Sequence, residues 1–271
     1  MELILQSAAV THQGRVRKHN EDSVLTFVRD PAKGDPLGIL IVADGVGGQK
    51  AGDIASQIAV ETVHEHMSWF LDRDPEDDTR PTTSQSTPTD GESPLETRLR
   101  IAIQAANKKI LAYAHDNPIQ AGNMGTTLTC ALIHGTSLTI AHIGDSRGYR
   151  LRDGELEQLT EDHSFVGQMV RDGQLTDEAY YIHPRRNVIT KALGQFDDAE
   201  VDLWTIPIEP GDELLLCSDG MWEMIRNPEI RTRLIDQEDL ETVAEELIQI
   251  ANDNGGSDNI SVVLGKLTRK D

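Results

Sequence analysis

The sequence is poor in cysteine. Its two cysteines, Cys130 and Cys217, each lie inside an apolar run that reads as a strand. Such a pattern is typical of buried thiols in a reducing compartment, and it argues against a fold held together by disulfide bonds.

Long hydrophobic runs are also absent. No apolar stretch approaches the roughly 20 residues that span a bilayer, and no basic N-terminal region precedes an apolar segment. We therefore expect a cytoplasmic protein with no membrane partner.

Positive charge is scarce. There are 25 Lys and Arg residues against 46 Asp and Glu residues, for a formal net charge of -21. This balance argues against nucleic acid or an anionic membrane as a partner, and its simplest interpretation is solubility.

The pattern of apolar residues predicts an α+β fold. Helical spacing covers 51–71, 95–114 and 240–251, and residues 126–159 are expected to form an antiparallel meander. Strands and helices come in groups, which favours two mainly antiparallel sheets with helices outside. Further strands are expected at 2–10, 23–28, 37–43, 201–208, 213–218 and 260–267.

Between the first two helices, residues 72–94 are rich in Asp, Pro, Thr and Ser and contain almost no apolar residue. This composition cannot offset the entropy cost of ordering, so we expect a flexible insertion there.

Carboxylates set beside glycines recur along the chain. Three of them follow apolar runs, where an unpaired buried charge costs several kcal/mol and a cation would relieve that cost. The motifs are Asn20-Glu21-Asp22, Asp44-Gly45-Val46-Gly47-Gly48, Gly144-Asp145-Ser146-Arg147-Gly148, Ser218-Asp219-Gly220 and Ser257-Asp258-Asn259.

Any one Asp-Gly pair is usually a plain turn. Together, the carboxylates can form a binuclear site for Mg²⁺ or Mn²⁺, which prefer oxygen ligands. Asp44 is the best bridging ligand, because Gly45 lets its own carbonyl approach the second ion. Asp219 and Asp258 would complete the coordination of one ion, and Glu21 would reach the other directly or through water. Two ions about 3.5–4 Å apart activate a water for in-line attack on phosphorus.

A site that uses residues 21 to 258 is hard to divide between independent units, so we expect one domain over 1–271. The order of the motifs resembles the PPM family, the type 2C metal-dependent protein serine/threonine phosphatases, in its bacterial style, over essentially the whole chain. The matching segments are Arg17-x-x-Asn20-Glu21-Asp22, Asp44-Gly45-x-Gly47-Gly48, Met124-Gly125-Thr126-Thr127, Gly144-Asp145-Ser146-Arg147, Asp162-His163-Ser164, Ser218-Asp219-Gly220 and Ser257-Asp258-Asn259.

The resemblance implies a central β-sandwich flanked by pairs of helices, with the metal site at one edge. It implies hydrolysis of phosphoserine and phosphothreonine on proteins by a water that two Mn²⁺ or Mg²⁺ ions activate, in opposition to a bacterial serine/threonine kinase. It also assigns Asp22 to the waters of the second ion, and Asp145 with Asp219 to a weaker third ion. We expect a monomer.

Two arginines receive different roles. Arg17, three residues before Asn20, is the candidate ligand for the substrate phosphate, because a guanidinium pairs two phosphate oxygens at once. Arg147 is expected to pair a carboxylate and order its own turn.

One position departs from the family. Several eukaryotic members have His after the bridging Asp-Gly, as a candidate proton donor to the leaving group, and this chain has Val46. His163 and His183 are alternatives, although a structural or exposed role is expected for each. Residues 165–187 match a flap beside the active site in bacterial relatives, and its Arg185 and Arg186 would either steer a substrate or stay solvated.

Other functions stay open. A non-catalytic scaffold with this fold would be expected to lose the carboxylates, which are all present. A phosphatase dedicated to one partner, such as a phosphorylated anti-sigma antagonist, or one acting on small molecules, would share the same chemistry.

Overall fold

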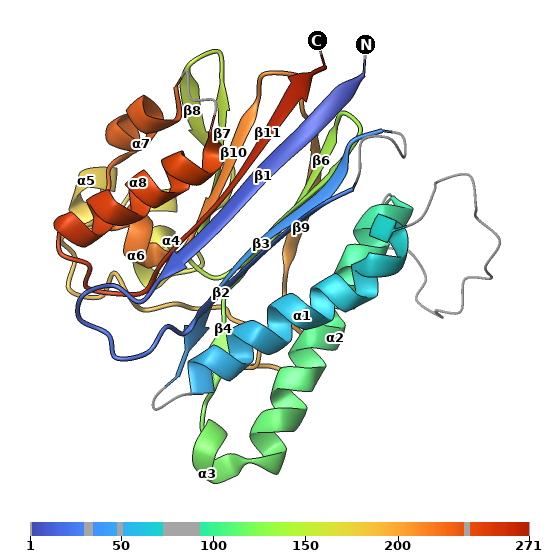
Figure 1. The fold of residues 1–271 in the computed structure, drawn as a ribbon. Coiled ribbons are helices and arrows are strands. Elements are labelled where there is room, and N and C mark those ends of the chain that lie inside the picture. Colours follow the sequence, from blue (N-terminus) through green and yellow to red (C-terminus); the bar gives the residue numbers. More distant parts are fainter. Residues whose placement is uncertain (1, 30–34, 48–50, 73–92, 236–238, 271) are drawn as a thin grey trace.

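Two antiparallel β-sheets pack face to face, and helices cover both outer faces (Figure 1). The computed structural model describes residues 2–29, 35–47, 51–72, 93–235 and 239–270. The expected α+β sandwich of four layers is therefore confirmed.

The first sheet contains both ends of the described chain, and its strand order is β1-β11-β10-β7-β8. Some neighbouring strands in this sheet are far apart in sequence, because β11 pairs with β1 on one side and with β10 on the other. The strands are β1 (Leu3–His12), β7 (Arg147–Arg152), β8 (Glu155–Gln158), β10 (Glu213–Cys217) and β11 (Ile260–Arg269).

The second sheet has the order β2-β3-β5-β6-β9, and the short β4 pairs with β3 beside this path. Every neighbouring pair in it is antiparallel. The strands are β2 (Asp22–Val28), β3 (Leu37–Val46), β4 (Gly125–Thr126), β5 (Leu128–His134), β6 (Ser137–Ile143) and β9 (Asp202–Pro207).

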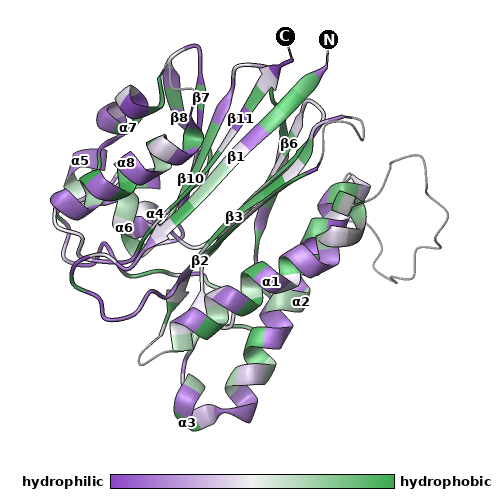
Figure 2. Ribbon diagram, viewed as in Figure 1, coloured by the Kyte–Doolittle hydropathy of each residue, from purple (hydrophilic) through white to green (hydrophobic). Residues whose placement is uncertain are grey.

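Strand β3 shows how the layers share one core. Successive side chains of a strand point to opposite faces. Ile39 and Ile41 therefore join the cluster under the helices, whereas Leu40 and Val42 join the cluster between the sheets. A strand segment buried on both faces needs apolar side chains at successive positions, which is why residues 39–43 are all hydrophobic (Figure 2).

Two long helices, α1 and α2, pack on the second sheet, and most of the others lie on the first. Ser93 and Glu96 form a capping box at the start of α2, which explains why the helix begins there. The helices are α1 (Ala51–Asp72), α2 (Pro94–Asp116), α3 (Pro118–Ala121), α4 (Phe165–Arg171), α5 (Asp177–Tyr180), α6 (Asp219–Trp222), α7 (Asn227–Leu234) and α8 (Leu240–Asp253).

The expected meander over 126–159 is wrong in one respect. Strands β5 and β6 belong to one sheet and β7 and β8 to the other, so the chain crosses the sandwich at residues 144–146. Gly144 makes this possible with φ +113°, a region that side chains disfavour. The prediction of a flexible insertion at 72–94 lies largely outside the described residues, because only Asp72, Ser93 and Pro94 are described.

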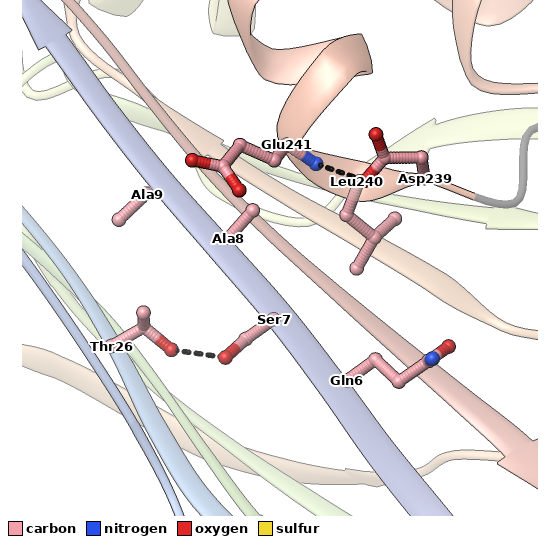
Figure 3. A pocket seen from close by; sticks show the side chains of 8 residues that line it. All are labelled: Gln6, Ser7, Ala8, Ala9, Thr26, Asp239, Leu240 and Glu241. Atoms are coloured by element: carbon pink, nitrogen blue, oxygen red, sulfur yellow. Dashed lines mark hydrogen bonds between the residues drawn. The ribbon is translucent and has the colours of Figure 1, made fainter.

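A pocket of about 370 Å³ lies between the middle of β1 and the start of α8 (Figure 3). Ser7 and Thr26 share a hydrogen bond of 2.6 Å in it. Its lining contains none of the residues singled out from the sequence. In the described part of the chain, no helix is long and apolar enough to cross a membrane.

Candidate metal and phosphate site

The strand ends bring the predicted carboxylates to one edge of the sandwich. Asp22 begins β2 and lies opposite Asp44 on β3. Asp145 lies in the crossover between β6 and β7, Asp219 follows β10, and Asp258 precedes β11. We call these five residues the carboxylate edge.

Their charges act on one another. Burial and then repulsion by Asp22, Asp219 and Asp145 raise the pKa of Asp44 well above its usual range. Burial raises the pKa of Asp219 in the same way, with Asp145 as the next cause. The pKa is raised to about 6 for Asp22 and to about 7 for Asp145, with burial the first cause in both. A cation nearby would favour the charged form of all four carboxyl groups and so lower their pKa.

Two oxygen atoms of the edge lack partners. In the described part of the chain, Asp22 Oδ1 and Asp219 Oδ1 are buried and accept no hydrogen bond. An unsatisfied buried carboxylate oxygen is costly, and hard cations bind through such atoms. Asp44 and Asp219 keep some accessible surface, so the edge is open to solvent. The donor set fits divalent cations that prefer oxygen ligands.

The predicted ligands do not form a complete metal-binding site in this structure. Among the residues described here, no three His, Cys, Asp or Glu side chains are grouped closely enough to hold a metal ion. One expected ligand is a backbone carbonyl, and Asp258 is paired with an arginine. The ligand roles of Glu21, Asp22, Asp44, Gly45, Asp145, Asp219 and Asp258 therefore stay predictions.

Gly45 lies where no side chain fits. A Cβ atom there would lie 2.5 Å from the Glu21 carbonyl oxygen. Opposite it, a Cβ on Gly52 would lie 2.8 Å from the Gly45 carbonyl oxygen and 3.1 Å from the Glu21 carboxyl carbon. Gly52 thus leaves room beside both predicted ligands, and sequence analysis missed it because a glycine near a helix start is common.

Serine hydroxyls hold Asp22. Ser218 Oγ and Ser261 Oγ donate to Asp22 Oδ2 over 2.8 and 2.7 Å. Asn259 joins the same network, since its side-chain oxygen accepts from the Glu21 backbone N–H over 2.8 Å. Sequence analysis missed the role of Ser261, which has no motif signal of its own, whereas Asn259 stood in the motif without an assigned part.

Arg17 lies at the edge. Its Nη2 atom is 2.6 Å from Asp258 Oδ2, and half of its side chain is exposed. The structure therefore brings the predicted phosphate ligand to the predicted metal ligands, with part of its guanidinium facing solvent.

Arg147 pairs a carboxylate, as expected. It donates to both oxygens of the buried Asp162, with the closest contact at 2.7 Å. His163 is structural, because Nδ1 accepts from the Gly144 N–H over 3.1 Å and Nε2 lies 3.1 Å from Asp202. His183 accepts from the Arg185 N–H over 3.2 Å.

Within 165–187, the two arginines are not simply solvated. Arg185 stacks over the Phe165 ring at 3.7 Å, and Arg186 lies 3.2 Å from Glu223. Helices α4 and α5 lie in this segment. Its role as a flap stays a prediction.

A family model described as "Protein phosphatase 2C" matches residues 12–265. The chain belongs to this family. It is 40% identical over 254 residues to the serine/threonine phosphatase stp of Listeria welshimeri, with 94% of this chain and 92% of the relative covered. The recognition made from the sequence is confirmed, and with it the enzyme class.

Solved structures of 2C phosphatases agree. The crystal structure of the Mycobacterium tuberculosis serine/threonine phosphatase PstP/Ppp superposes with a TM-score of 0.80 at 36% identity, covering 98% of this chain and 99% of the other. A crystal structure of the PstP catalytic domain in complex with two manganese ions has a TM-score of 0.78 at 34% identity, covering 98% and 100%.

Proposed function

We propose that this 2C phosphatase hydrolyses phosphoserine and phosphothreonine in other proteins with two divalent cations, Mn²⁺ or Mg²⁺, bound at the carboxylate edge. The observation that carries the proposal is a pair of buried oxygens, on Asp22 and Asp219, without hydrogen-bond partners among the described residues. Both residues repel the nearby Asp44 carboxylate. The family supports it, because a relative's crystal structure contains two manganese ions.

Each residue of the edge has a proposed role. Asp44 would bind both ions, and Asp219 and Asp258 would hold the first. Glu21 and the Gly45 carbonyl would hold the second, and Asp22 would orient its waters. Asp145, with Asp219, would hold a third and weaker ion. Bound there, the cations would lower the pKa of an attacking water and offset charge on the phosphate oxygens.

Arg17 binds the phosphate of the substrate. Its guanidinium is half exposed, so it can reach a group arriving from solvent while one nitrogen contacts Asp258. A fork of two parallel N–H donors suits two phosphate oxygens and fixes the orientation of the group. The substrate is thereby held next to the carboxylate edge.

The leaving alkoxide takes its proton from water. Val46 carries no titratable group, and both ring nitrogens of His163 are engaged, by Gly144 and Asp202. Burial lowers the pKa of His163, which further disfavours a proton-donating imidazolium there.

We also infer the setting in which the enzyme works. Phosphoserine and phosphothreonine in proteins are products of protein kinases, so the enzyme opposes a serine/threonine kinase. A monomer is supported because helices cover both outer faces of the sandwich. Buried thiols fit the cytoplasm.

Phosphate release from a phosphothreonine peptide tests the proposal. We expect release with Mn²⁺ or Mg²⁺ and none with excess EDTA. Hydrolysis of sugar phosphates, measured in parallel, should be much slower. Failure to release phosphate with any divalent ion would reject the catalytic role, and faster turnover of sugar phosphates would reject the substrate class.

A further inference from the structure

Trp222 joins the two segments that carry Asp145 and Asp219. It lies on α6 one helical turn after Asp219, and the Glu223 N–H donates to the Asp219 carbonyl oxygen over 2.9 Å within that turn. Its indole N–H donates to the backbone carbonyl oxygen of Asp145 over 3.0 Å. One side chain thus links the crossover at 144–146 to the start of α6.

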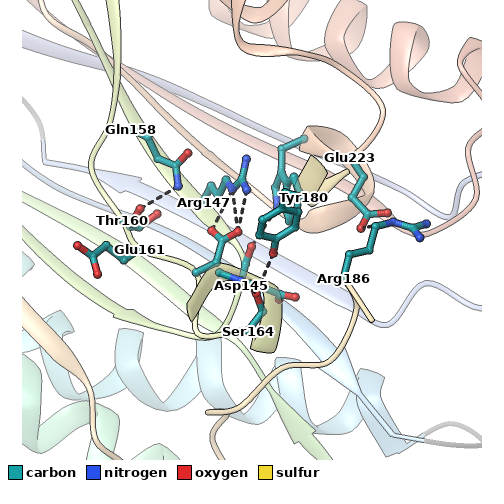
Figure 4. Close-up of polar contacts among 12 residues, drawn as sticks. Asp145, Arg147, Gln158, Thr160, Glu161, Ser164, Tyr180, Arg186 and Glu223 are labelled. Atoms are coloured by element: carbon teal, nitrogen blue, oxygen red, sulfur yellow. Dashed lines mark hydrogen bonds and ion pairs between the residues drawn. The ribbon is translucent and has the colours of Figure 1, made fainter. Parts of the chain in front are cut away.

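A second contact holds the indole from its face. The Arg147 guanidinium lies 3.6 Å from the Trp222 ring centroid, and it is fixed in turn by three hydrogen bonds to Asp162. Figure 4 shows Arg147 beside Asp145 and Tyr180. Tyr180 and Tyr181 contact the indole edge-on, with centroids 5.6 and 6.1 Å away. The indole has little room to move, since Trp222 is 1% exposed.

The link acts between two groups that repel each other. Asp145 is the largest source of the repulsion on Asp219, and Asp145 itself is buried. Without the Trp222 hydrogen bond, this repulsion would favour a larger distance between the crossover at 144–146 and α6. The N–H bond and the stacked guanidinium oppose that movement, because each is anchored in rigid, buried structure.

We propose that Trp222 is a positioning residue that sets the spacing of the Asp145 and Asp219 carboxylates, and thereby the affinity of the divalent cation that the two share. The inference depends on the proposed function, in which those residues hold the third ion. Trp222 itself touches neither the ion nor the substrate.

The test is Mn²⁺ binding to the Trp222→Phe variant by titration calorimetry. Phe keeps the ring in the core and removes the N–H donor. We expect the weakest binding step to lose about tenfold in affinity, the usual range for partners that orient ligands. The rate should then require more Mn²⁺ for saturation, with KM for the peptide unchanged. Trp204→Phe is the matched control, because Trp204 is a half-buried tryptophan on the second sheet.

The outcomes are distinct. Wild-type Mn²⁺ isotherms for Trp222→Phe would overturn the positioning role and leave the proposed function intact. Absence of metal-dependent turnover in the wild-type protein would instead reject the proposed function. If Trp222→Phe does not fold, Arg147→Lys takes its place, because lysine keeps the charge without the flat stacked face. The same weakening is expected for it, and unchanged binding would overturn the proposal.

Discussion

Arg17 and Asp258, 241 positions apart in sequence, form an ion pair of 2.6 Å at the carboxylate edge. The pair joins the proposed phosphate ligand to a proposed metal ligand. Arg17 is therefore held by the same residue that is expected to bind a cation, so we expect metal binding at the edge to affect how Arg17 orients the phosphate.

Arg17→Ala should chiefly raise KM for a phosphopeptide. The loss of charged hydrogen bonds to phosphate predicts a fall of roughly tenfold to a hundredfold in kcat/KM. Arg15→Ala is the matched control, because Arg15 lies in the same loop and pairs with the exposed Asp253. Steady-state kinetics measure both constants. Equal KM and kcat/KM for Arg17→Ala and wild type would show that Arg17 does not bind the substrate phosphate.

Asp44→Asn should abolish turnover while leaving the fold intact. In EDTA, its free energy of unfolding should be unchanged or higher by about 1 kcal/mol, because one repelled buried charge disappears. Asp116→Asn makes the same chemical change on an exposed carboxylate and serves as the control. Chemical denaturation gives the stability, and retained activity would contradict the bridging role.

Removal of metal should destabilise the protein more at pH 8 than at pH 5.5. The folded pKa is about 6 for Asp22 and about 7 for Asp145, above the usual 3.8, so stability is lost as pH rises through these values. One cation at 100 times its Kd adds about 2.7 kcal/mol, or several degrees in Tm. Thermal unfolding with Mn²⁺ and with EDTA at both pH values measures this, and a difference in Tm between Mn²⁺ and EDTA that is no larger at pH 8 than at pH 5.5 would contradict it.

Acid should destabilise the protein through His142. Burial lowers its pKa to about 4, and its ring lies 2.9 Å from Thr129 Oγ1 and 3.0 Å from the Glu161 carbonyl oxygen. Because the folded pKa is depressed, its stabilisation is present above pH 6.5 and is lost as pH falls toward 4.

The loss in the free energy of unfolding when His142 becomes protonated amounts to at most about 3 kcal/mol. Denaturation of the wild type and of His142→Gln, both in EDTA across this range, isolates the contribution. Parallel stability profiles would show that His142 does not titrate with unfolding. His115→Gln, at an exposed histidine, is the control.

The positions of the metal-ligand candidates could be predicted because each depends on a local pattern. An apolar run followed by Asp and Gly marks a strand end, and strand ends of an antiparallel sandwich meet at its edges. Asp44 and Asp219 were found in this way. The continuous apolar run at 37–43 also predicted a strand, and the structure extends this strand to Val46.

Other features depend on partners distant in sequence, which no local pattern reports. Ser261 and Gly52 act only through the contacts that folding creates with Asp22 and Gly45. The change of sheet at Gly144 is likewise invisible in the apolar pattern, since a strand in either sheet has the same period. Short helices such as α5, with four residues, carry too few positions to show a period.

The placement of β11 between β1 and β10 determines when the enzyme can first work during its synthesis. Asp258 and β11 are among the last parts of the described chain to leave the ribosome, and the first sheet cannot close before they arrive. Long-range pairings of this kind form late and slowly. A nascent chain stopped before Asp258 and β11 therefore lacks one predicted metal ligand and the strand that joins β1 to β10, so we expect no phosphatase activity before this segment has been made.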